Sequence, residues 1–329
     1  MTNYRAAAVH CKSYKNPELS KAIARQFELL GPIETFVKPG DRVLIKPNMI
    51  APKPRQYPVQ THPCVIIETA RLLKDAGAKV IVGDSPAWGT VFSCARALGL
   101  TEPLKHLGIP LRALNRPVYQ KIGQSQTRVG ISSVLQEVDT IINIPKFKMH
   151  SQMAGTFAVK NMFGCVCGKW KPYFHFTKGS SQEQFSRFLI DLYKAIAPKL
   201  TIIDAVVAMQ GSGPINGSPR NLGWIISSTD PIACERICAK LINMPAEYFP
   251  IIKTAKTMQY GCTNDNAIKI LGDIPDFSIQ QNFTPAKPSP IRFSLIRIIK
   301  SITKGLFISL LNHMPRNTAT AHFDKKQNQ

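Results

Sequence analysis

Short apolar runs alternate with longer amphipathic stretches along most of the chain. Residues 42–47 and 79–83 are apolar runs that follow turn signals. Between them, residues 64–76 carry apolar side chains at helical spacing, with Thr61 available as a cap ahead of Pro63. A strand, a helix and a strand in this order predict two parallel strands.

The same alternation recurs further along the chain. It predicts strands at 140–144, 200–204 and 224–228, and helices at about 17–30, 184–197, 230–242 and 245–257. The order predicts an α/β fold with a mostly parallel sheet and helices on both faces. With 329 residues, of which 44% are hydrophobic, the chain can bury a full core, and we expect residues 1–280 to form this α/β domain.

Beyond residue 280 the pattern changes. Residues 281–290 are proline-rich and predict a linker, and residues 315–329 predict a disordered tail. Residues 291–314 predict a basic amphipathic helix, with Arg and Lys on one side and Leu and Ile on the other. Four cations argue against a membrane span, and they favour docking on an anionic membrane surface, a partner groove or the core of the chain itself.

Polar side chains follow the predicted strands. In open parallel sheets, ligands bind beyond the carboxyl ends of the strands, so residues that follow apolar runs are candidates. They are Lys46, Asn48, Asp84, Ser85, Lys146, Lys148, His150, Asp204 and Asp230. We interpret Asp230 as a helix cap because Pro231 follows it, and we expect the others to meet at one edge of the sheet.

The stretch between Asp139 and Glu183 contains no carboxylate. Its basic and amide side chains lie among glycines and apolar residues: Lys146, Lys148, His150, Lys160, Asn161, Lys169, Lys171 and His175. Desolvation by apolar neighbours strengthens such cations as ligands and lowers the pKa of a lysine or histidine. The stretch therefore predicts an anion site, and the alternative is a basic loop in a basic protein.

A glycine-rich stretch between Asp204 and Arg220 follows a predicted strand directly. The backbone amides of Gly211 and Gly213 could hold an oxyanion, with Arg220 as a bidentate partner, and the alternative is a tight turn without a ligand. Neither a Walker sequence nor a Rossmann glycine fingerprint is present, so the sequence does not support nucleotide binding by the familiar motifs.

The formal net charge of +22 implies attraction to phosphates, anionic lipids or acidic metabolites. Nucleic acid is not favoured, because helix-turn-helix, zinc-finger and RNA-binding motifs are missing from the sequence. Eight cysteines without a secretory leader favour free thiols and a cytoplasmic protein, peripheral at a membrane if residues 291–314 bind one.

The cysteine spacing does not match a ferredoxin-type iron–sulfur ligand set. The sequence therefore does not identify a cofactor, and a metal and an organic group are the two alternatives. Cys165 and Cys167 are weak metal candidates, because other ligands would have to converge on them. The alternative for both thiols is simple packing in the core.

Six segments together resemble the domain of unknown function 362 family in their order along the chain. They are Val43–Asn48, Thr61–Pro63, Gly83–Pro86, Pro145–His150, Ala158–Gly164 and Asp204–Arg220. The resemblance spans residues 5–275 and implies a fold and a site rather than a reaction. Members are often fused to a ferredoxin-type module, which this chain lacks, and Gln210 stands where an acidic residue is expected.

The spacing of His150 and Lys160 is similar to that in the nickel-pincer lactate racemase family. That second similarity implies a lysine that anchors a cofactor and histidines that move protons next to a carboxylate. The flanking sequence of that family is missing from this chain.

The leading hypothesis is an enzyme that acts on a small carboxylate or phosphate, with isomerase-like, racemase-like or oxidoreductase-associated chemistry. The predicted ligand-binding residues are Lys46, Asn48, Ser85, Lys146, Lys148, Asn161, Gly211, Gly213 and Arg220, and the predicted catalytic residues are His150, Lys160, Asp84 and Asp204. His150 would be the acid or base, and Lys160 could be nucleophilic. Two alternatives are a redox or metal-handling accessory protein that works with a separate iron–sulfur protein, and a binding module recruited to membranes.

Overall fold

The computed structural model describes residues 4–168, 170–277 and 282–291. Ten strands form one sheet, in which β8 and β9 branch off the path β12-β1-β11-β10-β7-β2-β3-β4. The strands are β1 Tyr4–His10, β2 Arg42–Pro47, β3 Lys79–Asp84, β4 Leu111–Ala113, β7 Thr140–Ile144, β8 Lys146–His150, β9 Ala154–Thr156, β10 Leu200–Gln210, β11 Ser218–Ser228 and β12 Ile268–Gly272. A separate hairpin joins β5 Pro117–Ile122 to β6 Thr127–Ser132.

The predicted α/β fold, with a mostly parallel sheet and helices on both faces, is confirmed. Parallel pairing joins β10, β7, β2, β3 and β4 in that order. The exceptions are β11, which runs antiparallel to both of its neighbours, β1 and β10, and β9, which runs antiparallel to β8.

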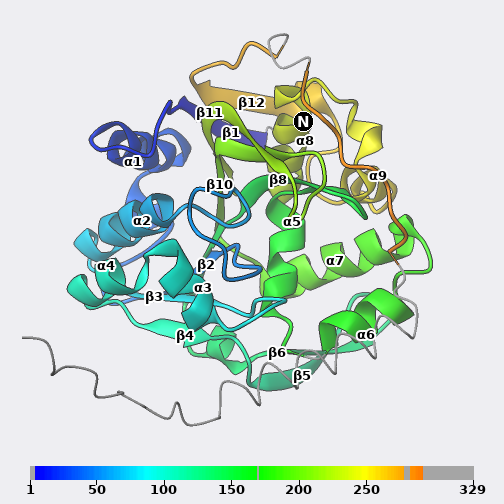
Figure 1. Ribbon diagram of the computed structural model, residues 1–329, viewed down its shortest axis with the longest axis horizontal. Helices are drawn as coiled ribbons and strands as arrows, with labels where there is room; N and C mark the ends of the chain where they lie inside the picture. The colour runs from blue at the N-terminus through cyan, green and yellow to red at the C-terminus, as the bar shows by residue number, and fades with distance from the viewer. Residues whose placement is uncertain (1–3, 169, 278–281, 292–329) are drawn as a thin grey trace, which may run out of the picture.

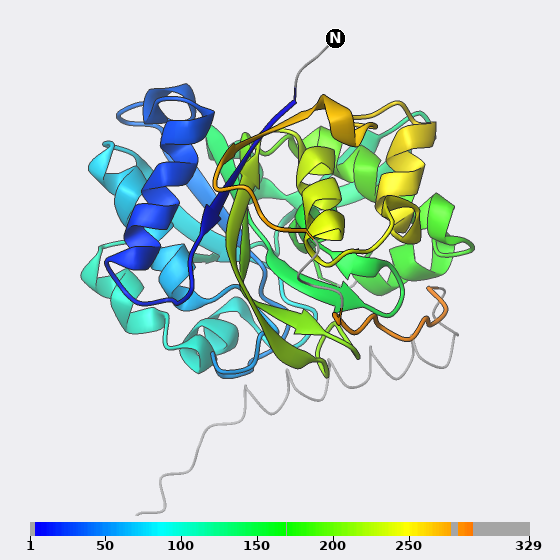
Figure 2. The same cartoon turned by 90° about the horizontal axis from the view of Figure 1, so that it is seen from above.

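Helices cover the two faces of the sheet as separate layers (Figure 1). One layer contains α1 Glu18–Leu30, α2 Pro63–Asp75, α3 Val91–Leu98 and α4 Thr101–His106, and the other contains α5 Ala158–Asn161, α7 Gln182–Ile196, α8 Pro231–Leu241 and α9 Pro250–Thr257. Figure 2 shows the sheet between the blue helices of the first layer and the green and yellow helices of the second. Successive side chains of β2 point to opposite faces of the sheet. Val43 and Ile45 therefore pack in the first core, and Leu44 packs in the second.

The structure corrects three predicted element boundaries, and the strand predicted at 224–228 begins already at Ser218. The strand predicted at 200–204 continues to Gln210, because its antiparallel pairing with β11 extends to Ser218. The helix predicted at 245–257 divides into a 3-10 turn, Ala246–Tyr248, and α9. Pro250 explains that break, since a residue before proline disfavours helical geometry and Phe249 is extended.

Residues 282–291, most of the predicted linker, lie against the core. Phe283, Ala286 and Ile291 are buried in its apolar clusters. Ser289 N–H donates to the Ser151 carbonyl at 2.8 Å. The remainder of the predicted amphipathic helix and the predicted tail lie outside the described residues. Within the described ranges, no helix is long and apolar enough to cross a bilayer.

Candidate functional site

Two buried ion pairs lie at the carboxyl edge of the sheet. Lys46 Nζ, at the end of β2, lies 2.8 Å from Asp84 Oδ1, at the end of β3. Lys146 Nζ on β8 lies 2.7 Å from Asp204 Oδ2 on β10. All four side chains are at most 1% exposed. The structure thus brings these four predicted site residues together in pairs, and each carboxylate offsets the charge of one lysine.

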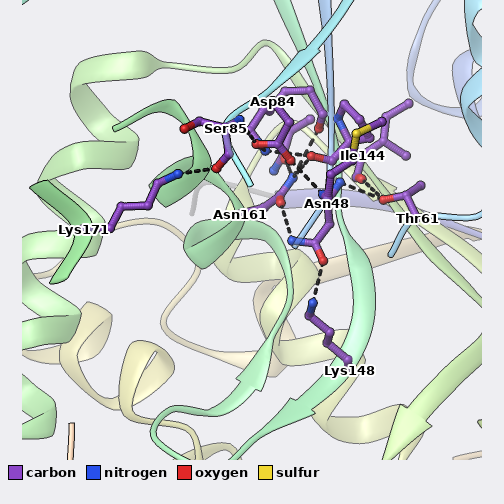
Figure 3. Close-up of polar contacts among 12 residues, drawn as sticks. Asn48, Thr61, Asp84, Ser85, Ile144, Lys148, Asn161 and Lys171 are labelled. Atoms are coloured by element: carbon purple, nitrogen blue, oxygen red, sulfur yellow. Dashed lines mark hydrogen bonds and ion pairs between the residues drawn. The ribbon is translucent and has the colours of Figure 1, made fainter. Parts of the chain in front are cut away.

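An amide network lies beside the first ion pair (Figure 3). Asn48 Oδ1 accepts from Lys148 Nζ at 2.6 Å, and Asn48 Nδ2 donates to Asn161 Oδ1 at 2.9 Å. Asn161 Nδ2 donates in turn to Asn143 Oδ1 at 2.7 Å. Lys148 also donates to the Val59 carbonyl at 2.9 Å. These neutral partners orient Lys148 without offsetting its charge.

Ser85 continues the same edge beyond β3. Its N–H donates to Asp84 Oδ1 at 2.7 Å, and its carbonyl accepts from Lys171 Nζ, which comes from α6, Trp170–Thr177 (Figure 3). Burial lowers the pKa of Lys171 to about 8. Lys169, two residues earlier, lies outside the described residues.

Gly164 brings backbone against the Lys46–Asp84 pair. A Cβ at this position would lie 2.4 Å from Asp84 Oδ1 and 2.6 Å from Lys46 Nζ, which is closer than real side chains approach. The short helical segment Met162–Cys165 therefore packs onto the pair only because residue 164 has no side chain. This requirement explains one glycine of the family-like segment Ala158–Gly164.

Four nitrogen side chains form what we call the lysine–histidine cluster: Lys148, His150, Lys160 and His175. Burial is the main cause that lowers each pKa, and repulsion by Lys160 adds to it for the other three. The pKa of Lys160 falls to about 8, that of His175 to about 3, and those of Lys148 and His150 lie well below their usual ranges.

Lys160 is the partly exposed member of this cluster. Within the residues that the structure describes, no carboxylate pairs with it, whereas Lys46 and Lys146 each have one. Within the carboxylate-free stretch recognised in the sequence, Lys160 is therefore desolvated without a paired carboxylate, whereas Asp204 pairs with Lys146 and Asp84 partly offsets the charge of Lys148. Groups with strongly shifted pKa values mark candidate functional sites. A desolvated charge lowers the stability of the fold, and a bound ligand of opposite charge would restore part of that stability.

His150 is held in one orientation. Its Nδ1 accepts a hydrogen bond from the backbone N–H of Gln152 at 3.1 Å. Because its pKa is low, the ring is neutral at pH 7, and the hydrogen must lie on Nε2. The nitrogen left for a ligand is therefore a hydrogen-bond donor.

Sequence reasoning missed Tyr14 and His62, which complete the second ion pair. The Tyr14 hydroxyl donates to Asp204 Oδ1 at 2.8 Å and accepts from Lys146 Nζ at 2.8 Å. The His62 amide donates to Asp204 Oδ2 at 2.9 Å, and its ring stacks on Tyr14 with centroids 3.6 Å apart. The Thr61–Pro63 motif was a signal for His62, but Tyr14 lies in an irregular segment before α1 that carries none.

The glycine-rich loop, shortened to residues 211–217, closes on the chain itself. Gly211 N–H donates to the Thr284 carbonyl at 2.9 Å, and Gly213 N–H donates to the Gly211 carbonyl at 2.7 Å. Arg220 lies on β11 opposite Ala208. The two amides predicted to hold an oxyanion are thus already paired.

Cys165 and Cys167 are buried thiols. Burial raises the pKa of Cys165 to about 12 and also raises that of Cys167, so both stay protonated at neutral pH. Among the described residues, no three His, Cys, Asp or Glu side chains lie together as a metal-binding group. Both thiols are buried, and Cys165 packs in the core that contains α7; their role as metal ligands stays a prediction.

Comparisons with known proteins relate this geometry to a family. A thylakoid-associated protein of Synechocystis sp. is 32% identical over 297 residues, which cover 90% of this chain and 92% of that protein. Two solved structures are similar at 11% identity and a TM-score of 0.47: the lactate racemase apoprotein of Thermoanaerobacterium thermosaccharolyticum and a protein from Thermotoga maritima. The alignments cover 74% and 72% of this chain, and 57% and 61% of those chains. The family model described as a domain of unknown function, DUF362, matches residues 43–240, and the chain belongs to this family.

Proposed function

We propose that this protein is an enzyme that binds a small carboxylate or phosphate at the lysine–histidine cluster. The observation that supports this most strongly is the lowered pKa of all four members, together with Lys160, for which the described residues supply no paired carboxylate. A bound anion would stabilise the protonated lysines and repay part of their desolvation. Evolution tolerates such a destabilised group where function uses it.

The roles of His150 and Lys160 differ from those expected from the sequence. His150 presents Nε2–H, so it supports substrate binding as a donor rather than proton abstraction. With a pKa of about 8, roughly one in ten Lys160 side chains is an uncharged amine at pH 7. Lys160 is therefore the stronger candidate for general base or nucleophile, in proton transfer beside the anionic group or covalent attachment.

The paired lysines support the site in another way. Lys46 and Lys146 are buried against Asp84 and Asp204, so we assign them to positioning rather than to direct neutralisation of a substrate. Their partners join the ends of β2 and β3, and the start of β8 to the middle of β10, at the edge where the cluster lies.

The test is ligand-induced thermal stabilisation across a panel of small carboxylates and phosphates, measured for the wild type and for Lys160→Met. Lys121→Met is the matched control, because Lys121 is an exposed residue on the separate β5–β6 hairpin. We expect Lys160→Met to remove the shift that a bound anion produces and Lys121→Met to retain it. Equal shifts in all three proteins, or no shift with any compound, would contradict the proposal.

A second proposal is peripheral association with an anionic membrane. It is supported by the name of the thylakoid-associated relative, the net charge of +22 and the basic amphipathic pattern at 291–314. Flotation with neutral and anionic vesicles should separate the full chain from a chain that ends at residue 291. We expect only the full chain to float, and only with anionic vesicles; identical behaviour of the two proteins would reject this role.

A further inference from the structure

One buried carboxyl group lies outside the two ion pairs of the site. Glu235, on α8, is 1% exposed, and sequence reasoning did not single it out. In the part of the chain that the structure describes, no cation pairs with it, and the neighbouring Arg236 pairs with Asp265 instead. Burying a carboxyl group costs free energy unless hydrogen bonds satisfy its oxygens. The partners of Glu235 therefore show what this group does in the fold.

Those partners are the first backbone N–H groups of α5. Glu235 Oε1 accepts from the Val159 N–H at 3.0 Å, and the Ala158 N–H is a second donor to the same side chain. Burial raises the pKa of Glu235 to about 8, and the two N–H donors act in the opposite direction. The carboxyl group thus caps α5 from a residue 76 positions after Val159 in the chain.

α5 needs a cap from another element because of its length and its own sequence. The first N–H groups of any helix have no partner within it, and Phe157, which precedes α5, supplies no side-chain cap. The helix has only four residues, and a helix of that length does not form in isolation. Contacts with neighbouring elements therefore decide where its residues lie.

The other end of α5 is fixed by the amide network. Asn161, its last residue, donates to Asn143 Oδ1 at 2.7 Å, and Asn143 Nδ2 donates to the Ala158 carbonyl at 3.0 Å. Glu235 is the contact that holds the N–H groups of the first turn. Both ends of the short helix are thus tied to side chains of other elements.

Lys160 lies between these two fixed ends. It follows Val159, which donates to Glu235, and it precedes Asn161. Its charge is close enough to the other three members of the lysine–histidine cluster to lower their pKa values. If the first turn of α5 loosened, water would reach the Lys160 ammonium group and reduce its desolvation.

We propose that Glu235 is a positioning residue: its carboxyl group fixes the first turn of α5 and so holds Lys160 within the lysine–histidine cluster. The inference deepens the proposed function and rests on it, because it names the residue that keeps the proposed base or nucleophile in place. The alternative is a cap that stabilises the whole fold, and such a cap would affect buried lysines on other elements equally.

Competitive labelling with acetic anhydride tests the proposal without any ligand, because it measures the pKa of two lysines in one sample. Lys171 is the internal reference: burial also lowers its pKa to about 8, but it lies on α6. We expect Glu235→Leu, which removes the acceptor oxygens at similar size, to raise the pKa of Lys160 by about one unit or more and to leave that of Lys171 unchanged. An unchanged Lys160, or an equal rise at both lysines, would overturn the proposal.

Two further variants assign the effect to the contact. Glu235→Gln retains an acceptor oxygen, so we expect it to keep the pKa of Lys160 within about half a unit of the wild-type value. If it raises the pKa of Lys160 by one unit or more, the role of the acceptor is wrong, and this result decides even where the leucine variant does not fold.

Glu68→Leu is the matched control, because Glu68 is also buried, at 8% exposure, but lies on α2 in the other helix layer. We expect it to leave the pKa of both lysines unchanged. A rise at Lys160 as large as in Glu235→Leu would overturn the assignment to α5.

Thermal stabilisation by acetate and by inorganic phosphate separates this inference from the proposed function. If Glu235→Leu raises the pKa of Lys160 but the probes stabilise Lys160→Met as much as the wild type, the positioning role stands and the proposed role of Lys160 fails. If the pKa of Lys160 stays at its wild-type value in Glu235→Leu and Lys160→Met loses the stabilisation, the inference fails and the proposed function stands.

Discussion

At the scale of single residues, the edge of the sheet contains two kinds of lysine. Lys46 and Lys146 are buried against carboxylates, whereas Lys160 is partly exposed and has no carboxylate partner in the described part of the chain. The sequence predicted that Lys46 and Lys146 meet Asp84 and Asp204 at strand ends, because the rule for parallel sheets places ligand-binding side chains there. Lys160 was predicted from the carboxylate-free stretch instead. Which lysine pairs with which aspartate was not predictable, since it depends on strand order and on contacts such as Tyr14 to Asp204.

We expect Lys160→Met to stabilise the fold at neutral pH. The folded-state pKa of about 8 lies below the usual lysine value, so the desolvated charge destabilises the protein at pH values below 8. This cost falls as the pH rises from 8 towards 10.5. Urea unfolding should show a gain of about 1–3 kcal/mol for the variant at pH 7 that shrinks by pH 10. A difference that does not change with pH would show that Lys160 is not desolvated.

A second residue-scale prediction concerns the Lys46–Asp84 pair. Lys46→Met leaves a buried carboxylate without its cation, which we expect to cost about 3–5 kcal/mol in urea unfolding. The matched control is Arg42→Met, which removes the exposed Arg42–Asp139 pair at the start of the same strand and should cost less than about 1 kcal/mol. Equal losses would mean that burial does not make the inner pair more important.

At the scale of elements, patterning predicted the central strands and most of the long helices. It failed at β8, because Lys146 and Lys148 read as polar positions although all five residues of the strand are buried. It also failed at the start of the glycine-rich loop, where residues 205–210 continue β10. In both places long-range pairing between strands decided the outcome, and local sequence does not contain that information.

Gly164→Ala tests how closely the segment Met162–Cys165 approaches β2 and β3. The added methyl group would overlap Asp84 and Lys46, so we expect a loss of about 2–4 kcal/mol in thermal or urea unfolding. Gly168→Ala is the control: it has open space around its Cβ but a positive φ, which should cost about 1–2 kcal/mol. A smaller loss for Gly164→Ala than for Gly168→Ala would contradict the close approach.

At the scale of the whole molecule, residues 282–291 hold distant elements together. Gln152 Nε2, between β8 and β9, donates to the Pro290 carbonyl at 2.8 Å, and Ile291 is buried in the core that contains α7. The proline content predicted a linker. Composition indicates how stiff the chain is locally, and it does not indicate which side chains pack against the core. The contacts of this segment come from single apolar residues, which no periodic pattern marks.

Truncation tests this interpretation of the C-terminal segment. A chain that ends at residue 281 loses the burial of Phe283, Ala286 and Ile291, and a chain that ends at 291 keeps it. We expect the shorter chain to be less stable by about 3–5 kcal/mol in urea unfolding. Equal stability of the two chains would show that the segment only rests on the surface.

Lys160 holds a desolvated positive charge without a paired carboxylate in the described part of the chain, and its own titration tests this. Competitive labelling with acetic anhydride between pH 6 and 11, read by mass spectrometry, measures the pKa of one lysine against a free lysine standard in the same tube. We expect a pKa of about 8 for Lys160, against about 10.4 for the standard. A Lys160 that titrates together with the standard would contradict it.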